Sequence, residues 1–162
     1  CASQNIEKVM DEEMSTRLQM AICGVAQLAA SMAKDSFDQS DYARDSAVCP
    51  VCGEVTTMAV VTPPDGKRMM HCNTCGFEWM VKRIKCLHCG SEDAKQRIYL
   101  KNEAYPGIEM VVCLLCGDYF KEIDARELHV QDFMWEDIRT LPLNFASERW
   151  LAEQAVKNNQ IH

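Results

Sequence analysis

The chain has 162 residues, 48% of them hydrophobic and 25% charged, which excludes a disordered, collagen-like or coiled-coil chain as a whole. Its 17 basic and 24 acidic residues give a net charge of −7, with most of the acidic excess in residues 1–48 (net −4) and 127–162 (net −3). Nucleic acid normally requires a basic surface, and anionic lipid a polybasic segment, so we expect no nucleic acid and no membrane among its partners.

An amphipathic helix is predicted over residues 6–32. Its apolar residues recur at steps of three or four, which is the helical period; they are Ile6, Met10, Met14, Leu18, Ala21, Val25, Leu28 and Met32. We expect this face to pack, but its residues from Met14 to Met32 also fit a heptad, so a homodimer through the helix is an alternative. An acidic linker follows, so that residues 1–46 form one N-terminal segment.

The same region contains the most apolar stretch, Met20–Ala33. It is too short to cross a bilayer. The acidic residues at 11–13 are wrong for the positively charged start of a signal peptide, so secretion is not predicted.

The middle of the chain predicts two small β modules, residues 47–84 and 85–125. Each half consists of a C-x-x-C turn (a knuckle), a strand, a turn, a second strand, a second knuckle and a third strand. This repeated order indicates a duplication. The expected strands are Val55–Thr62, Arg68–His71, Phe77–Lys82, Gln96–Leu100, Ile108–Val112 and Tyr119–Ile123. The turn residues 63–66 predict a hairpin between the first two. Residues 126–162 return to a helical pattern that Pro142 interrupts.

Eight of the ten cysteines form four C-x-x-C pairs, and glycine follows every pair. Glycine suits a metal-binding knuckle because the residue after the second cysteine takes a positive φ there. Two knuckles supply the four thiolates of one tetrahedral site, so four knuckles predict two four-cysteine centres. The predicted metal ligands are Cys49, Cys52, Cys72, Cys75, Cys86, Cys89, Cys113 and Cys116.

Three pairings of the four knuckles exist. Neighbouring pairs need intervening loops of only 19 and 23 residues and respect the duplication, so we favour them. The cofactors would then be two metal ions, each bound by four cysteines, and the spacing suits zinc or iron equally.

Other interpretations of the cysteines exist. Structural disulfides need an oxidising compartment, and a dithiol oxidoreductase needs one isolated C-x-x-C at a helix N-terminus. A nucleic-acid-binding zinc ribbon is the stronger rival, although the acidic charge and few aromatic residues argue against it. No nucleophile–base pair, phosphate loop or open coordination position is visible, so no catalytic residues are predicted and the chain is not expected to be an enzyme.

Several motifs together resemble the C-terminal metal region of the FdhE-type formate dehydrogenase accessory proteins. They are Cys49-Pro50-Val51-Cys52-Gly53, His71-Cys72-Asn73-Thr74-Cys75, Glu78-Trp79, Val81–Cys86, Cys113–Lys121 and Asp137–Leu141. The resemblance covers roughly residues 47–150. Members of that family carry a longer helical N-terminal part, whereas about one helix precedes the knuckles here.

The resemblance implies a cytoplasmic maturation factor that binds the catalytic subunit of a molybdenum- or tungsten-containing formate dehydrogenase and is needed for its activity. It also implies an α+β fold: two tandem rubredoxin-like or zinc-ribbon β modules flanked by an N-terminal helix and C-terminal helices. Arg83, Asp137 and Thr140 lie in matched segments outside the ligand set and are expected to contact the partner. A rubredoxin-like redox protein that acts on a partner's metal centre is the alternative function.

Overall fold

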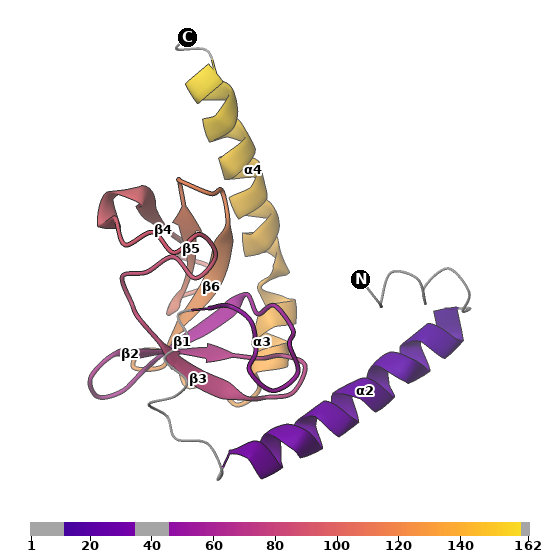
Figure 1. Ribbon diagram of the computed structural model, residues 1–162. Coiled ribbons are helices and arrows are strands. Elements are labelled where there is room, and N and C mark those ends of the chain that lie inside the picture. Colours follow the sequence, from indigo (N-terminus) through magenta and orange to yellow (C-terminus); the bar gives the residue numbers. More distant parts are fainter. Residues whose placement is uncertain (1–11, 35–45, 160–162) are drawn as a thin grey trace.

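A computed structural model describes residues 12–34 and 46–159 (Figure 1). The start of the predicted helix, including Ile6 and Met10, and positions 35–45 of the linker lie outside the described residues. The elements are α2 (Glu12–Ala33), β1 (Met58–Thr62), β2 (Lys67–His71), β3 (Glu78–Val81), the 3-10 turn η2 (Ala94–Gln96), β4 (Arg97–Lys101), β5 (Ile108–Cys113), β6 (Tyr119–Asp124), α3 (Phe133–Arg139) and α4 (Leu141–Asn159). The predicted α+β fold with two ribbons and flanking helices is therefore confirmed.

All six strands belong to one sheet, in the order β3-β2-β1-β6-β5-β4. Each ribbon is an antiparallel three-stranded unit, β1–β3 for the first and β4–β6 for the second. A parallel pairing of β1 with β6 joins them. The second ribbon thus repeats the first by translation along the sheet. β1, the first strand of the first ribbon, lies beside β6, the third strand of the second ribbon.

β1 lies in the middle of the sheet and is covered on both faces. Four of its five residues are buried, without the alternation of a half-exposed strand. Ala59 packs in one cluster with Met70 and Trp79, and Met58 in another with Ile123 and Leu143. The two ribbons and the C-terminal helices therefore share a core, with β1 at its centre.

The predicted hairpin between the first two strands is confirmed. β1 and β2 pair antiparallel from Ala59 opposite Met70 to Thr62 opposite Lys67. The turn closes with the Gly66 amide donating to the Thr62 carbonyl at 2.9 Å. Gly66 has a φ of +68°, a conformation that a side chain disfavours.

The C-terminal segment forms two helices. The Asp132 side chain accepts from the Trp135 amide at 3.0 Å and caps α3. The interruption falls at Thr140, and Pro142 lies in the first turn of α4, where its missing amide hydrogen is tolerated. Figure 1 shows α4 running beside β5 and β6.

The apolar face of α2 does not pack as the sequence predicts. Only the small residues Ala26 and Ala30 are buried, against the first ribbon. The large residues expected to pack are exposed; they are Met14, Leu18, Val25, Leu28 and Met32. Figure 1 shows much of the helix projecting away from the sheet. The helix contacts the ribbon through its alanines because small side chains allow the closest approach. No helix within residues 12–34 and 46–159 is long and apolar enough to span a membrane.

Candidate metal centres

All four knuckles have the same backbone design. In each, the glycine amide donates to the carbonyl of the first cysteine, at 2.7 to 3.0 Å. The amide of that first cysteine donates in turn to the carbonyl oxygen of the residue five positions later, at 2.8 to 3.0 Å. Each of these glycines has a positive φ, between +70° and +77°; they are Gly53, Gly76, Gly90 and Gly117. The prediction that glycine serves this conformation is therefore confirmed.

The structure brings the eight knuckle cysteines into two groups, each with its sulfur atoms within 4.8 Å of one another. The first group is Cys49, Cys52, Cys72 and Cys75, and the second is Cys86, Cys89, Cys113 and Cys116. This is the neighbouring pairing that the short loops favour. The first knuckle precedes β1 and the second lies between β2 and β3; the third and fourth hold the same places in the second ribbon.

The sulfur positions fit a tetrahedral metal ion. The Sγ atoms of Cys49 and Cys75 are 3.5 Å apart, and those of Cys86 and Cys116 are 3.8 Å apart. Four metal–sulfur bonds of about 2.3 Å in a tetrahedron give sulfur–sulfur distances of about 3.8 Å. Two groups of this size and composition can each hold one thiophilic ion such as zinc or iron.

Backbone amides donate hydrogen bonds that stabilise negative charge on the cysteine sulfur atoms. The Cys49 sulfur accepts from the amides of Val51 and Cys52, and the Cys86 sulfur accepts from those of His88 and Cys89. The corresponding two amides of the second knuckle donate to Cys72. Such N–H···S contacts stabilise a thiolate, which is the ligand form of cysteine.

The thiols of one group are also coupled to one another. The hydrogen bond from Cys49, with further donors from the backbone, lowers the pKa of Cys72 to about 4. Burial raises the pKa of Cys75 to about 12. Four thiolates this close together require a metal ion to balance their charge.

The two groups differ in exposure. Cys49, Cys72 and Cys75 are buried and Cys52 is half-buried, whereas Cys89 and Cys116 are exposed. Two histidines near the knuckles belong to neither group: His71 contacts Glu78 and packs on Phe133, and His88 pairs with Asp118.

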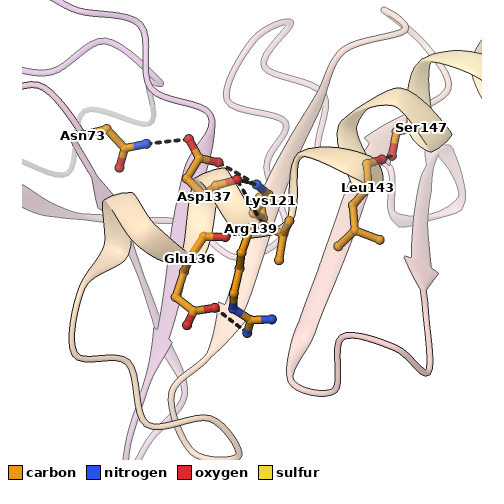
Figure 2. Close-up of polar contacts among 8 residues, drawn as sticks. Asn73, Lys121, Glu136, Asp137, Arg139, Leu143 and Ser147 are labelled. Atoms are coloured by element: carbon orange, nitrogen blue, oxygen red, sulfur yellow. Dashed lines mark hydrogen bonds and ion pairs between the residues drawn. The ribbon is translucent and has the colours of Figure 1, made fainter.

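The side chains of Asp137 and Thr140 point into the protein. Figure 2 shows Asp137 between Asn73 and Lys121. Its carboxylate accepts from Asn73 Nδ2 at 2.9 Å and from Lys121 Nζ at 2.5 Å, and the Lys121 side chain is 2% exposed. Thr140 is fully buried, and its hydroxyl donates to the Glu136 carbonyl at 2.5 Å. Asp137 therefore holds α3 to both ribbons, whereas the Thr140 hydroxyl bonds only within the α3 segment.

Arg83 lies outside this network and is exposed, between β3 and the third knuckle. Its carbonyl accepts from Arg68 Nη1 at 2.6 Å and from Arg97 Nη1 at 2.5 Å. The sequence did not reveal the importance of Asn73 and Lys121. The place of Asn73 inside a knuckle and of Lys121 in an apolar strand were the only local signals.

Comparison with known proteins finds proteins that the ribbons resemble. The family model described as "FdhE, central domain" matches residues 48–83. "Protein FdhE" from Escherichia coli O1:K1 / APEC is 28% identical over 113 residues, which cover 68% of this chain and 36% of that protein. "Protein FdhE" from Shigella boydii serotype 18 matches over the same extent with the same identity.

A solved structure shows the same likeness in three dimensions. It is "The crystal structure of the FdhE protein from Pseudomonas aeruginosa", with a TM-score of 0.55 and 28% identity over 67% of this chain and 37% of that one. The fold and site define a protein with two tandem four-cysteine ribbons, and the comparisons confirm the resemblance to the FdhE-type proteins. The chain spans a little over a third of the length of these relatives.

Proposed function

We propose that this protein is an accessory factor in formate dehydrogenase maturation. It binds the catalytic subunit of a molybdenum- or tungsten-containing formate dehydrogenase in the cytoplasm, is needed for that enzyme's activity and has no turnover of its own. The observation that carries the proposal is the pair of four-cysteine groups, the first of which lies within the residues that match the FdhE central domain.

The metals have a structural role in this proposal. Each ribbon is a three-stranded unit whose knuckles are loops, and units this small bury too little apolar surface to fold without an added constraint. All eight ligand positions belong to cysteine, so each ion would be saturated by protein. Closed sites with four cysteine ligands fix shape and leave no position for a substrate.

The C-terminal helices offer the contact surface that we assign to the partner. Since Asp137 and Thr140 point inward, a partner would meet the outer side of the same segment. Five large apolar residues of α3 and α4 are exposed and form what we call the apolar patch: Met134, Trp135, Ile138, Leu141 and Phe145. Clustered exposed apolar side chains of this kind mark protein–protein contact sites.

Arg83 remains a proposed partner contact because it is exposed. Asp137 and Thr140 would affect a partner only indirectly, by positioning α3. Charge reversal at Asp137 would break its contact with Lys121 inside the protein. A test of the interface therefore needs outward residues.

The test is gene deletion followed by complementation. Deletion should abolish formate dehydrogenase activity, and the unaltered gene should restore it. Trp135→Ala with Phe145→Ala should lose co-purification of the catalytic subunit under reducing conditions while both metals stay bound. The matched control is Tyr99→Ala on the edge strand β4, which removes an exposed aromatic residue that is not part of the patch. Full activity in the deletion strain would refute the function, and retained binding in the double variant would refute the surface.

A rubredoxin-like redox protein is the second candidate. The exposure of Cys89 and Cys116 favours it, since electron transfer needs a centre near the surface. Iron–thiolate centres absorb visible light and zinc centres do not, so the colour of anaerobically purified protein separates the two functions. A colourless protein with two zinc ions excludes electron transfer.

The exposed face of α2 suggests self-association. Met14, Leu18, Val25, Leu28 and Met32 are exposed on a helix that docks through Ala26 and Ala30. We propose that a second copy covers this face in a homodimer. Light scattering should give twice the chain mass, and Val25→Glu with Leu28→Glu should return it to the monomer value; a monomeric unaltered protein would exclude the dimer.

A further inference from the structure

The two four-cysteine centres have the same ligands and backbone design but different surroundings. In the first centre, Cys72 is fully buried and Cys49 and Cys75 are at most 3% exposed. In the second centre, Cys89 and Cys116 are exposed. Because both centres come from one repeated module, the first serves as an internal reference for the second.

Helix α2 accounts for part of this difference. Ala26 and Ala30 pack in the same cluster as Cys49, Cys72 and Cys75. The same part of α2, from Ala21 to Ala29, lines a groove that reaches Val51 and Cys52 of the first knuckle. A second cavity that reaches Cys75 is lined by α2 as well, so a reagent that enters either space passes along the helix.

The second centre has no such cover within the described residues. The fourth knuckle carries Leu114 and Leu115, and both are exposed. The exposed sulfurs each lie next to a buried one: Cys89 is 3.8 Å from Cys113, and Cys116 is 3.8 Å from Cys86. An incoming reagent can thus reach one sulfur of each of these pairs without any movement of the fold.

We propose that the second centre is a reactive thiolate site, with Cys89 and Cys116 open to two-electron oxidants and to competing metal chelators, while the first centre reacts more slowly. With hydrogen peroxide as oxidant, two thiolates each give up one electron and join in a disulfide. The peroxide takes up both electrons and two protons and becomes two water molecules. The loss of two ligands releases the metal. Each exposed sulfur has a buried partner at 3.8 Å, so Cys89–Cys113 and Cys86–Cys116 are two of the disulfides that can form.

The experiment uses the full chain loaded with zinc at both centres. Hydrogen peroxide is added, released zinc is followed with a chromogenic chelator, and free thiols are then alkylated and located by peptide mass spectrometry. Because oxidation follows thiolate exposure, we expect two phases, with the first zinc released at least about tenfold faster than the second. Peptides protected from alkylation in the fast phase should contain the cysteines of the second centre. Equal rates, or early loss from the first centre, would overturn the proposal.

A variant tests whether α2 provides the protection. Ala26→Glu places a charge where the helix meets the first ribbon and should open the first centre, so that the two release rates approach each other. The matched control is Ala29→Glu on the same helix, which lines the groove but is not buried, and should leave the first centre slow. Unchanged rates in Ala26→Glu would refute the role of α2.

This inference rests on metal binding at both centres. The metal count of the starting protein is measured first, and fewer than two ions per chain would contradict metal binding. Two ions released at equal rates would contradict only the difference in reactivity.

Discussion

Arg68 and Glu122 form a buried ion pair that joins the two ribbons across β1. Arg68 Nη2 lies 2.5 Å from Glu122 Oε2, and both side chains are at most 7% exposed. Arg68 belongs to β2 and Glu122 to β6, the two strands that flank β1. The small side chain of Ala59, which lies opposite Glu122, leaves room for the contact.

Removal of one member of this pair should destabilise the protein strongly. Glu122→Ala leaves the Arg68 charge buried without its carboxylate, which costs about 3–5 kcal/mol. The double variant Arg68→Met with Glu122→Leu should recover most of that loss, since apolar residues of similar volume often replace a buried pair at little cost. Urea unfolding of the metal-loaded protein measures both. A loss below about 1 kcal/mol in Glu122→Ala, the size of an exposed pair, would show that the ribbons are joined by other contacts.

The contact of Asp137 with Lys121 should control the docking of α3. Asp137→Ala leaves a nearly buried ammonium group unpaired and should cost about 3–5 kcal/mol. Limited proteolysis of this variant should cut near residues 125–132 at a protease concentration that leaves the unaltered protein intact. Glu148→Ala is the control, because it removes an exposed carboxylate on α4 that accepts from Tyr119. Equal cutting of both variants would contradict a special role for Asp137.

Two glycines with the same backbone conformation should respond differently to alanine. Gly53 has a φ of +76° and open space where a Cβ would stand, so Gly53→Ala should cost about 1–2 kcal/mol of backbone strain. At Gly107, with a φ of +78°, the added Cβ would meet Leu128 Cβ at 2.9 Å. Gly107→Ala should therefore cost about 1–3 kcal/mol more, from overpacking. Thermal unfolding of the two variants compares them, and equal losses would show that Leu128 moves freely.

Metal content should follow the two groups of cysteines. Cys72→Ser and Cys113→Ser should each lower the content from two ions per chain to one and destabilise the affected ribbon, because binding and folding are one equilibrium in such sites. Cys23→Ser is the control, since Cys23 lies on α2 outside both groups. Elemental analysis and circular dichroism report the two effects. Two ions in Cys72→Ser would remove that residue from the ligand set.

Much of the local structure could be predicted from the sequence. The expected strand Ile108–Val112 matches β5 within one residue, and the hairpin between β1 and β2 follows its turn residues. The glycine after each C-x-x-C pair predicted the backbone conformation of the knuckle. The short loops between knuckles predicted which cysteines group together. These features depend on interactions within a few residues or within one module.

The remaining features depend on contacts between modules. The pairing of β1 with β6 brings residues 58 and 121 together, and no local period specifies it. The same holds for Arg68 with Glu122, whose charges resemble ordinary surface residues in the sequence. The helical spacing of apolar residues predicted α2. It could not show that Ala26 and Ala30 would be the residues that dock on the first ribbon.

The parallel pairing of β1 with β6 also fixes an order of assembly during synthesis. The first ribbon has all of its strands and thiolates once Val81 has left the ribosome, so its centre can close early. The flank of β1 that receives β6 then stays open until residue 124 has emerged. During that interval the nascent chain exposes a strand edge at the centre of its future sheet, which makes it the stage most in need of protection from pairing with other chains.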